Sequence, residues 1–347
     1  MKAAFLEESL KITIGEAAKP GFTDDEVLIR VRSCGVCATD VKKFTGKRSS
    51  PHFPFILGHE PAGTVAEVGA RVKSDLKTGD RVAVAPVIVC GHCHGCTSGL
   101  LEVEGMGICE NSHVIGYHGN GAFTEYISVP PENVFKIPDN LSFRDAAIIE
   151  PVAACANGVF RAIKTPPGKA VVLGAGFMGL TCLALLKMLG AQVLIADILD
   201  ERLETARKLG ADKVVNSREK NLEEEVKHFT EGWGADSVIC AVGIKELTES
   251  GIRMLGKAGK LILLASGAQG TKIEFDLNET HYFCPVITGA SSYTNGLFLW
   301  TMDVLARGLI DTDTLITHSG GLEDVEKFLE MTRDLEGLKK VILMGED

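Results

Sequence analysis

The sequence has no uninterrupted apolar run of the length that a membrane span requires, about 20 residues. Its most apolar stretch, residues 179–190, is interrupted by Lys187. Glu7 and Glu8 come too early for the apolar core of a secretory signal. These absences exclude a membrane partner and predict a cytoplasmic protein.

Positive charge is also scarce, with 36 Lys and Arg against 46 Asp and Glu and a net charge of −10. A protein that binds nucleic acid needs a basic surface, so no nucleic-acid partner is expected. The length of 347 residues favours two domains rather than one.

Disulfides are not expected, because a cytoplasmic compartment keeps thiols reduced. Clustered cysteines are therefore interpreted as metal ligands. Four scattered cysteines lie in apolar surroundings and are expected to be small core residues: Cys155, Cys182, Cys240 and Cys284.

The chain shows two patterns in turn. Up to about residue 150, short β-like runs are separated by turn residues, and Val27, Ile29 and Val31 alternate with arginines, as in a half-buried strand. This pattern predicts a β-rich, barrel-like domain.

After about residue 165, apolar strands alternate with helical segments, which predicts an α/β doubly wound parallel sheet. Residues 166–168, Pro-Pro-Gly, mark the entry to this domain. Past about 290 the alternation lapses into a helix, a loop at 315–321, a helix at 322–334 and a last strand at 339–344. The expected strands are 170–176, 192–197, 212–217, 235–243, 260–267 and 285–291.

A glycine-rich motif follows the first of these strands and precedes a helix. It consists of Gly174, Gly176, Phe177, Met178 and Gly179. In this setting the glycines allow a tight turn and close approach of a pyrophosphate to the helix N-terminus, which predicts a dinucleotide site.

Asp197 ends the next strand, eighteen residues after Gly179. Its carboxylate would accept hydrogen bonds from the adenosine ribose and repel a 2′-phosphate, so NAD is favoured over NADP. Arg202, one turn further on, either lies along the adenine ring or is a solvated helix charge.

A first candidate metal site lies in CGVCATD, residues 34–40, together with GHE, residues 58–60. Cysteine, histidine and carboxylate side chains suit zinc, and fewer than four protein ligands leave a position open for substrate. A redox CxxC pair is the alternative, although that motif needs a helix N-terminus in a βαβ unit. Sequence spacing alone does not prove that the two segments meet.

A second candidate is the run from Cys90 to Cys109. Iron–sulfur binding is disfavoured because Leu100 stands where the fourth cysteine of that motif belongs. Four thiolates would close the zinc shell, which predicts a structural site. The ligand set is Cys90, Cys93, Cys96 and Cys109, with His92, His94 and His113 as nearby alternatives.

These motifs, in this order and with IIEP at 148–151, resemble the zinc-dependent medium-chain alcohol dehydrogenase family. Glu150 makes the sorbitol and threonine dehydrogenase branch the most similar. The resemblance implies a GroES-like catalytic domain of residues 1–152 and 291–347 and a Rossmann NAD-binding domain of residues 153–290. It also implies two zinc ions, one catalytic and one structural, and a homodimer or homotetramer.

For the catalytic zinc, the resemblance implies Cys37 and His59 as ligands, with Glu60 and Glu150 as ligand or near-ligand carboxylates that exchange with water. Cys34 is then a bystander in a tight turn.

Two further residues take roles from the resemblance. Thr39 links the substrate oxygen to the proton relay, and Asp40 orients His59. Two departures are visible. Lys42 stands where many relatives carry a relay histidine, and twelve residues rather than seven separate Cys96 from Cys109, which leaves the role of Cys109 open.

The expected function is hydride transfer between an alcohol or polyol and NAD. A threonine-type amino-alcohol dehydrogenase is the alternative, and a basic group could favour a phosphorylated polyol: Lys42, Lys43, Lys47 and Arg48. A non-catalytic NAD(H)-binding regulator is a more distant alternative.

Overall fold

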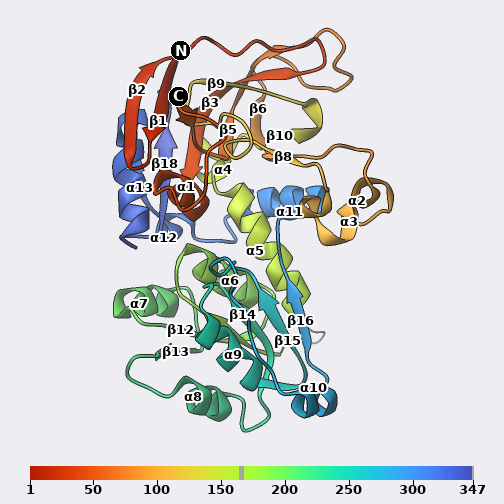
Figure 1. Cartoon of the computed structure of the whole chain (residues 1–347), viewed down its shortest axis with the longest axis vertical. Helices are drawn as coiled ribbons and strands as arrows, with labels where there is room; N and C mark the ends of the chain where they lie inside the picture. The colour runs from red at the N-terminus through yellow and green to blue at the C-terminus, as the bar shows by residue number, and fades with distance from the viewer. Residues whose placement is uncertain (164–167, 346–347) are drawn as a thin grey trace. The chain divides into compact units, whose positions relative to one another are not determined.

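The computed structural model describes residues 1–163 and 168–345, so Pro166 and Pro167 of the expected domain entry lie outside the described residues. The chain forms two compact units (Figure 1). Unit 1 consists of Met1–Pro151, Thr294–Gly308 and Thr312–Asp347, and unit 2 of Val152–Tyr293 and Leu309–Asp311. No helix in the described part is long and apolar enough to cross a membrane.

Unit 1 is built on β-sheets. A three-stranded sheet has the order β2-β1-β4, and a larger one the order β10-β6-β5-β3-β18-β17, with β9 also paired to β3. Strands β7 and β8 form a separate pair. The bounds are β1 Lys2–Glu8, β2 Lys11–Glu16, β3 Val27–Val36, β4 Phe55–Ile56, β5 Glu60–Val68, β6 Arg81–Val84, β7 Val87–Ile88, β8 His113–Val114, β9 Tyr126–Val129, β10 Val134–Lys136, β17 Ile316–Gly320 and β18 Lys339–Leu343.

The helices of unit 1 are short apart from α11 and α13. Helices α2 and α3 belong to a lobe that projects from the sheets (Figure 1). The bounds are α1 Ala38–Phe44, α2 His94–Thr97, α3 Leu101–Glu104, η1 Met106–Ile108, η2 Pro131–Asn133, α4 Phe143–Ala146, α11 Asn295–Ala306, α12 Thr312–Leu315, η3 Leu322–Asp324 and α13 Val325–Arg333. Helix α5, Ile149–Ala162, begins in unit 1 and continues in unit 2.

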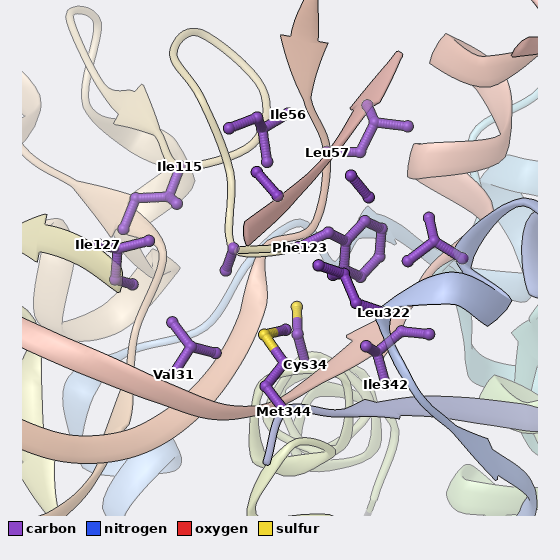
Figure 2. Packing of buried hydrophobic residues seen from close by; sticks show 14 of the residues in the cluster. Val31, Cys34, Ile56, Leu57, Ile115, Phe123, Ile127, Leu322, Ile342 and Met344 are labelled. Atoms are coloured by element: carbon purple, nitrogen blue, oxygen red, sulfur yellow. The ribbon is translucent and has the colours of Figure 1, made fainter. Parts of the chain in front are cut away.

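The core of unit 1 joins segments from both ends of the chain. Figure 2 shows Cys34, Phe123, Leu322 and Ile342 in one buried cluster. Cys34 lies inside β3 rather than in a tight turn, and its side chain is fully buried. The expectation that Cys34 lies in a tight turn was therefore wrong, because β3 continues to Val36 before the chain turns.

The expected loop at 315–321 is also not a loop. Residues 316–320 form β17, which pairs in parallel with β18. The strand carries a single buried apolar side chain, Ile316. It is held by backbone pairing at a sheet edge, so its polar sequence lacked the apolar alternation that signals a strand.

Unit 2 is a parallel sheet with the order β13-β12-β11-β14-β15-β16. This is the doubly wound order 3-2-1-4-5-6, so the predicted sheet and its six strands are confirmed. The bounds are β11 Lys169–Leu173, β12 Gln192–Asp197, β13 Lys213–Asn216, β14 Ala235–Cys240, β15 Leu255–Leu263, β16 Val286–Gly289, α6 Phe177–Met188, α7 Asp200–Lys208, α8 Leu222–Phe229, α9 Lys245–Arg253 and α10 Leu277–Phe283.

Three of the four scattered cysteines, Cys155, Cys182 and Cys240, are buried as predicted, but Cys284 is exposed. Cys284 ends α10 in the left-handed region, at φ 49°. Its apolar neighbours Phe283 and Val286 are themselves 44% and 49% exposed. Apolar surroundings in the sequence therefore did not mean burial, because this segment lies at the open edge of the sheet beside β16.

Candidate active site

Strand pairing joins the two segments of the first candidate metal site. Gly35 of β3 pairs with Glu60 of β5 in antiparallel register. Cys37 follows β3 as the N-cap of α1, and His59 precedes β5. As a result, possible ligand atoms of Cys37, His59 and Glu60 all lie within 4.8 Å of one another.

Asp40 is the residue that organises this group. One carboxylate oxygen, Oδ2, accepts the Cys37 backbone N–H at 2.9 Å, and Oδ1 accepts hydrogen bonds from Gly58 N at 3.2 Å and His59 Nδ1 at 3.1 Å. Because a carboxylate accepts, Nδ1 carries the hydrogen and Nε2 of His59 is left for a metal. This hydrogen bond fixes the orientation of the His59 ring.

The electrostatics of the group favour a cation. Burial opposes charge on His59, but Asp40 and Cys37 raise its pKa well above the ordinary value. In the metal-free protein a proton on His59 therefore balances the negative charge of the Asp40 carboxylate. A metal ion that binds His59 would displace that proton. Sulfur, imidazole nitrogen and carboxylate oxygen are the donors that zinc takes in proteins, so the residues fit zinc.

Lys339 is a site residue that the sequence analysis missed. Its Nζ lies 2.7 Å from Oε1 and 2.5 Å from Oε2 of Glu60, and the lysine is 3% exposed. A Cβ added to Gly35 would lie 1.8 Å from Glu60 Oε2 and 3.0 Å from Lys339 Cε, so only glycine leaves room for this pair. The available signal was the pair of lysines, Lys339 and Lys340, at the start of an otherwise apolar last strand.

The charge of Lys339 is maintained by its neighbours. Burial opposes it, but the carboxylate of Glu60 and the charges of Cys37 and Glu150 raise the pKa of Lys339 above its ordinary value. The lysine thus remains an ammonium ion at neutral pH and compensates the carboxylates of the site.

Glu150 and Thr39 lie near this group but are not part of the 4.8 Å ligand set. Glu150 is half-buried in the first turn of α5, and its charge acts on Lys339. Thr39 is half-buried on α1, two residues after Cys37. Lys42 is exposed on the same helix.

The second candidate site brings four thiols together. Cys90 Sγ lies 3.8 Å from Cys96 Sγ, and Cys93 Sγ lies 3.5 Å from Cys96 Sγ and 3.9 Å from Cys109 Sγ. Four sulfurs at about 2.3 Å from a tetrahedral zinc are about 3.8 Å apart, and disulfide sulfurs about 2 Å. The cluster fits a structural zinc ion.

The long spacing before Cys109 is absorbed by two short helical turns, α3 and η1. Cys109 follows η1 directly and accepts a hydrogen bond from Cys90 N at 3.3 Å. The His92 backbone N–H lowers the pKa of Cys90 to about 6, which favours the thiolate that zinc binds. The three alternative ligands are exposed: His92, His94 and His113.

The glycine motif of unit 2 forms the turn between β11 and α6. Gly174 has φ +97°, which favours glycine, and a Cβ on Gly179 would lie 1.8 Å from Gly174 O. A Cβ on Gly176 would meet nothing nearer than Arg202 Nη1 at 3.9 Å. Gly174 and Gly179 therefore pack the turn, while Gly176 faces open space where a phosphate can approach.

Asp197 and Arg202 flank this turn. Asp197 Oδ2 accepts Ala175 N at 2.6 Å, while Oδ1 accepts Ile198 N at 2.7 Å and Leu199 N at 3.0 Å. The carboxylate thus holds the glycine turn to the end of β12. Phe177 and Met178 open α6 and are half-buried.

A β-rich unit with a Cys–His–carboxylate group and a doubly wound unit with a glycine turn define a zinc-dependent, nicotinamide-linked dehydrogenase. Comparison with known proteins agrees. Residues 23–139 match the alcohol dehydrogenase GroES-like domain, and residues 178–307 match the zinc-binding dehydrogenase family.

The chain is 32% identical to the sorbitol dehydrogenase of Bacillus subtilis over 95% of its length and 93% of the relative's. It is 31% identical to the D-arabitol-phosphate dehydrogenase of Enterococcus avium over 93% and 91%. A zinc-binding dehydrogenase of Sinorhizobium meliloti, solved with NADP, superposes with a TM-score of 0.90 at 28% identity, over 99% and 98% of the two chains. The chain belongs to the zinc-dependent medium-chain alcohol dehydrogenase family, with a GroES-like domain and a Rossmann domain.

The buried Glu60–Lys339 pair should be strongly coupled. Lys339→Met leaves a buried carboxylate unpaired and is expected to lower the free energy of unfolding of the zinc-free protein by about 3–5 kcal/mol. Glu60→Gln combined with Lys339→Met should cost much less than the sum of the single changes, measured by denaturant unfolding. Lys19→Met is the matched control, because its pair with Glu67 is exposed and worth under about 1 kcal/mol. Additive costs at Glu60 and Lys339 would contradict the coupling.

Zinc analysis tests the four-thiol cluster. The wild type should contain two zinc ions per chain, and Cys109→Ser should lose one of them, with a lower melting temperature but an intact Cys37–His59 site. Cys284→Ser is the control, because that thiol is exposed and far in sequence from either ligand set. Two zinc ions retained in the Cys109 variant would exclude Cys109 as a ligand.

Proposed function

We propose that this oxidoreductase transfers a hydride from the hydroxyl-bearing carbon of an alcohol or polyol to NAD at the Cys37–His59 group. The observation that carries the proposal is the ligand set of Cys37, His59 and Glu60 within 4.8 Å, with Asp40 hydrogen-bonded to His59 Nδ1. Cys37 and His59 would hold the catalytic zinc. Glu60 and Glu150 would be its ligand or near-ligand carboxylates, in exchange with water.

An alcohol loses hydride slowly because its pKa lies far above 7. Zinc, when bound here, supplies a Lewis acid that favours the alkoxide. Thr39, on the first turn of α1, receives the hydroxyl proton and passes it towards solvent. Asp40 keeps His59 in the tautomer that binds metal. Lys339 compensates Glu60, so that the site does not accumulate negative charge when the substrate ionises.

In unit 2, the dinucleotide would bind with its pyrophosphate over Gly176 and its ribose beside Asp197. The Asp197 carboxylate disfavours a 2′-phosphate, which supports NAD over NADP. Arg202 would lie along the adenine ring, and its Nη1, 3.9 Å from the position of a Cβ on Gly176, supports a role beside the dinucleotide.

We expect a cytoplasmic homodimer or homotetramer. Strand β16 is the edge of its sheet, and exposed apolar side chains lie on it and on the preceding helix α10: Leu277 at 78%, Tyr282 at 71% and Val286 at 49%. Such an edge is open to pairing with a second copy. A molecular mass of one chain, measured by light scattering, would contradict the proposed dimer or tetramer.

The function is tested by NAD reduction on a panel of polyols, polyol phosphates, secondary alcohols and threonine. We expect turnover that is lost when a chelator removes zinc and restored by added zinc. Threonine as the preferred substrate would favour the amino-alcohol alternative. NAD binding without turnover of any alcohol would favour the non-catalytic regulator and overturn the proposal.

Asp197→Ala separates the two roles of this carboxylate. Loss of its contacts to the glycine turn should weaken both cofactors, whereas loss of the ribose contact weakens NAD alone. The affinity for NAD is therefore expected to fall about tenfold more than that for NADP, measured by fluorescence titration. Asp200→Ala, on the exposed side of α7, is the control. Equal losses for both cofactors would reject the ribose contact.

A further inference from the structure

Cations surround Tyr117 in unit 1, in a cluster that the proposed reaction does not use. The guanidinium carbon of Arg48 lies 3.9 Å from the centre of the Tyr117 ring. The Lys43 ammonium lies 4.9 Å from the same centre and 4.8 Å from that of Phe55. His118 packs against Tyr117 with ring centres 5.3 Å apart. We call Lys43, Arg48, Tyr117 and His118 the Tyr117 cluster.

No carboxylate neutralises these cations by direct contact. In residues 1–163 and 168–345, neither Lys43 nor Arg48 forms an ion pair, and the Lys43 ammonium instead donates to Ser49 O at 3.1 Å. Lys43 is 2% exposed, and a cation buried without an acidic partner costs free energy. In a chain of net charge −10, composition alone does not explain such a cluster.

The pKa values report the resulting positive potential. Burial and the charge of Arg48 lower the pKa of Lys43, against the opposing charge of the Asp40 carboxylate. Burial and the charges of His113, Lys43 and Arg48 likewise lower the pKa of His118. The cluster therefore offers an anion a favourable field and leaves His118 neutral at pH 7.

The Tyr117 cluster lies beside the metal ligands. Lys43 is on α1 four residues after Thr39, about 6 Å along the helix. On the other side, Gly116 packs directly on Gly58, the residue before His59, since a Cβ on Gly116 would lie 2.3 Å from Gly58 O. Both segments that carry the cluster thus border the Cys37–His59 group. An alcohol a few carbons long that reacts there would carry its far end towards Arg48.

Arg48 is suited to bind that far end. Its backbone N–H is fixed to Lys42 O at 2.9 Å, and its side chain is exposed and stacked on Tyr117. Stacking on a ring holds the guanidinium plane while its N–H groups remain available at the edge. That edge matches two oxygens of a phosphate, and the doubly charged phosphate group balances Arg48 and Lys43 together.

We propose that Arg48, stacked on Tyr117 and supported by Lys43, binds the phosphate group of a phosphorylated polyol whose hydroxyl is oxidised at the Cys37–His59 group. The inference rests on the proposed function and narrows its substrate class. Lys47 lies outside the Tyr117 cluster, since in the described part of the chain it is exposed and is not one of the cations over the Tyr117 or Phe55 ring.

Matched substrate pairs test the inference in the zinc-loaded enzyme. D-arabitol phosphate should be oxidised with a kcat/KM at least about 100-fold above that of D-arabitol, because a charge-assisted hydrogen-bond pair contributes that factor. Arg48→Gln should raise KM for the phosphate ester about 10- to 100-fold with little change in kcat, and bring the ratio of the two substrates close to one. Lys47→Gln is the control and should leave the ratio unchanged.

Binding of the same two compounds and of inorganic phosphate is measured by calorimetry, independently of turnover. Tighter binding of the phosphate ester that is lost in Arg48→Gln supports the inference. Equal binding of polyol and polyol phosphate overturns it, even if the enzyme turns over other alcohols. A raised KM for NAD with every substrate would assign Arg48 to the cofactor and also overturn it. Absence of turnover with any alcohol would instead overturn the proposed function.

Discussion

The pairing of β3 with β5 is the constraint on which the site depends. It places Gly35 opposite Glu60, so Cys37 and His59 emerge side by side from strands that lie far apart in the sequence. The same sheet continues from β3 to β18, which delivers Lys339 to Glu60. A buried carboxylate needs a cation, and here the last strand supplies one. The pairing of β18 with β3 therefore also brings in the cation that compensates the charge of the site.

Two carboxylates, those of Asp40 and Asp197, fix the conformation of loops without a bound ligand. Asp40 ties the N-terminus of α1 to Gly58 and His59, and Asp197 ties the glycine turn to the end of β12. In each case one acidic side chain accepts hydrogen bonds from backbone N–H groups and also positions a ligand-binding group. That group is His59 for Asp40 and the glycine turn for Asp197. Such preorganisation reduces the entropy lost on binding. It also means that these carboxylates have structural as well as chemical roles.

Much of the fold and of the candidate site was predictable from the sequence, because short local patterns specify these elements. Period-two alternation marked β3, the strand–helix rhythm marked all six strands of the Rossmann sheet, and the Cys90–Cys96 spacing marked a metal lobe. The predictions failed where contacts with segments distant in the sequence decide whether a residue joins a strand or is buried. Polar β17 forms through backbone pairing at an edge, and Cys284 is exposed although its sequence neighbours are apolar.

The sequence by itself determined which ligand-binding groups are available: thiols and a histidine for zinc, glycines for a pyrophosphate, and an aspartate for a ribose. Tertiary structure alone decided which of these groups meet. It placed Lys339 on Glu60 across 279 positions, gathered Cys109 with the other thiols despite the long spacing, and stacked Arg48 on Tyr117. The reason is physical, since side-chain contacts between distant segments follow from sheet register and packing, which local spacing does not encode.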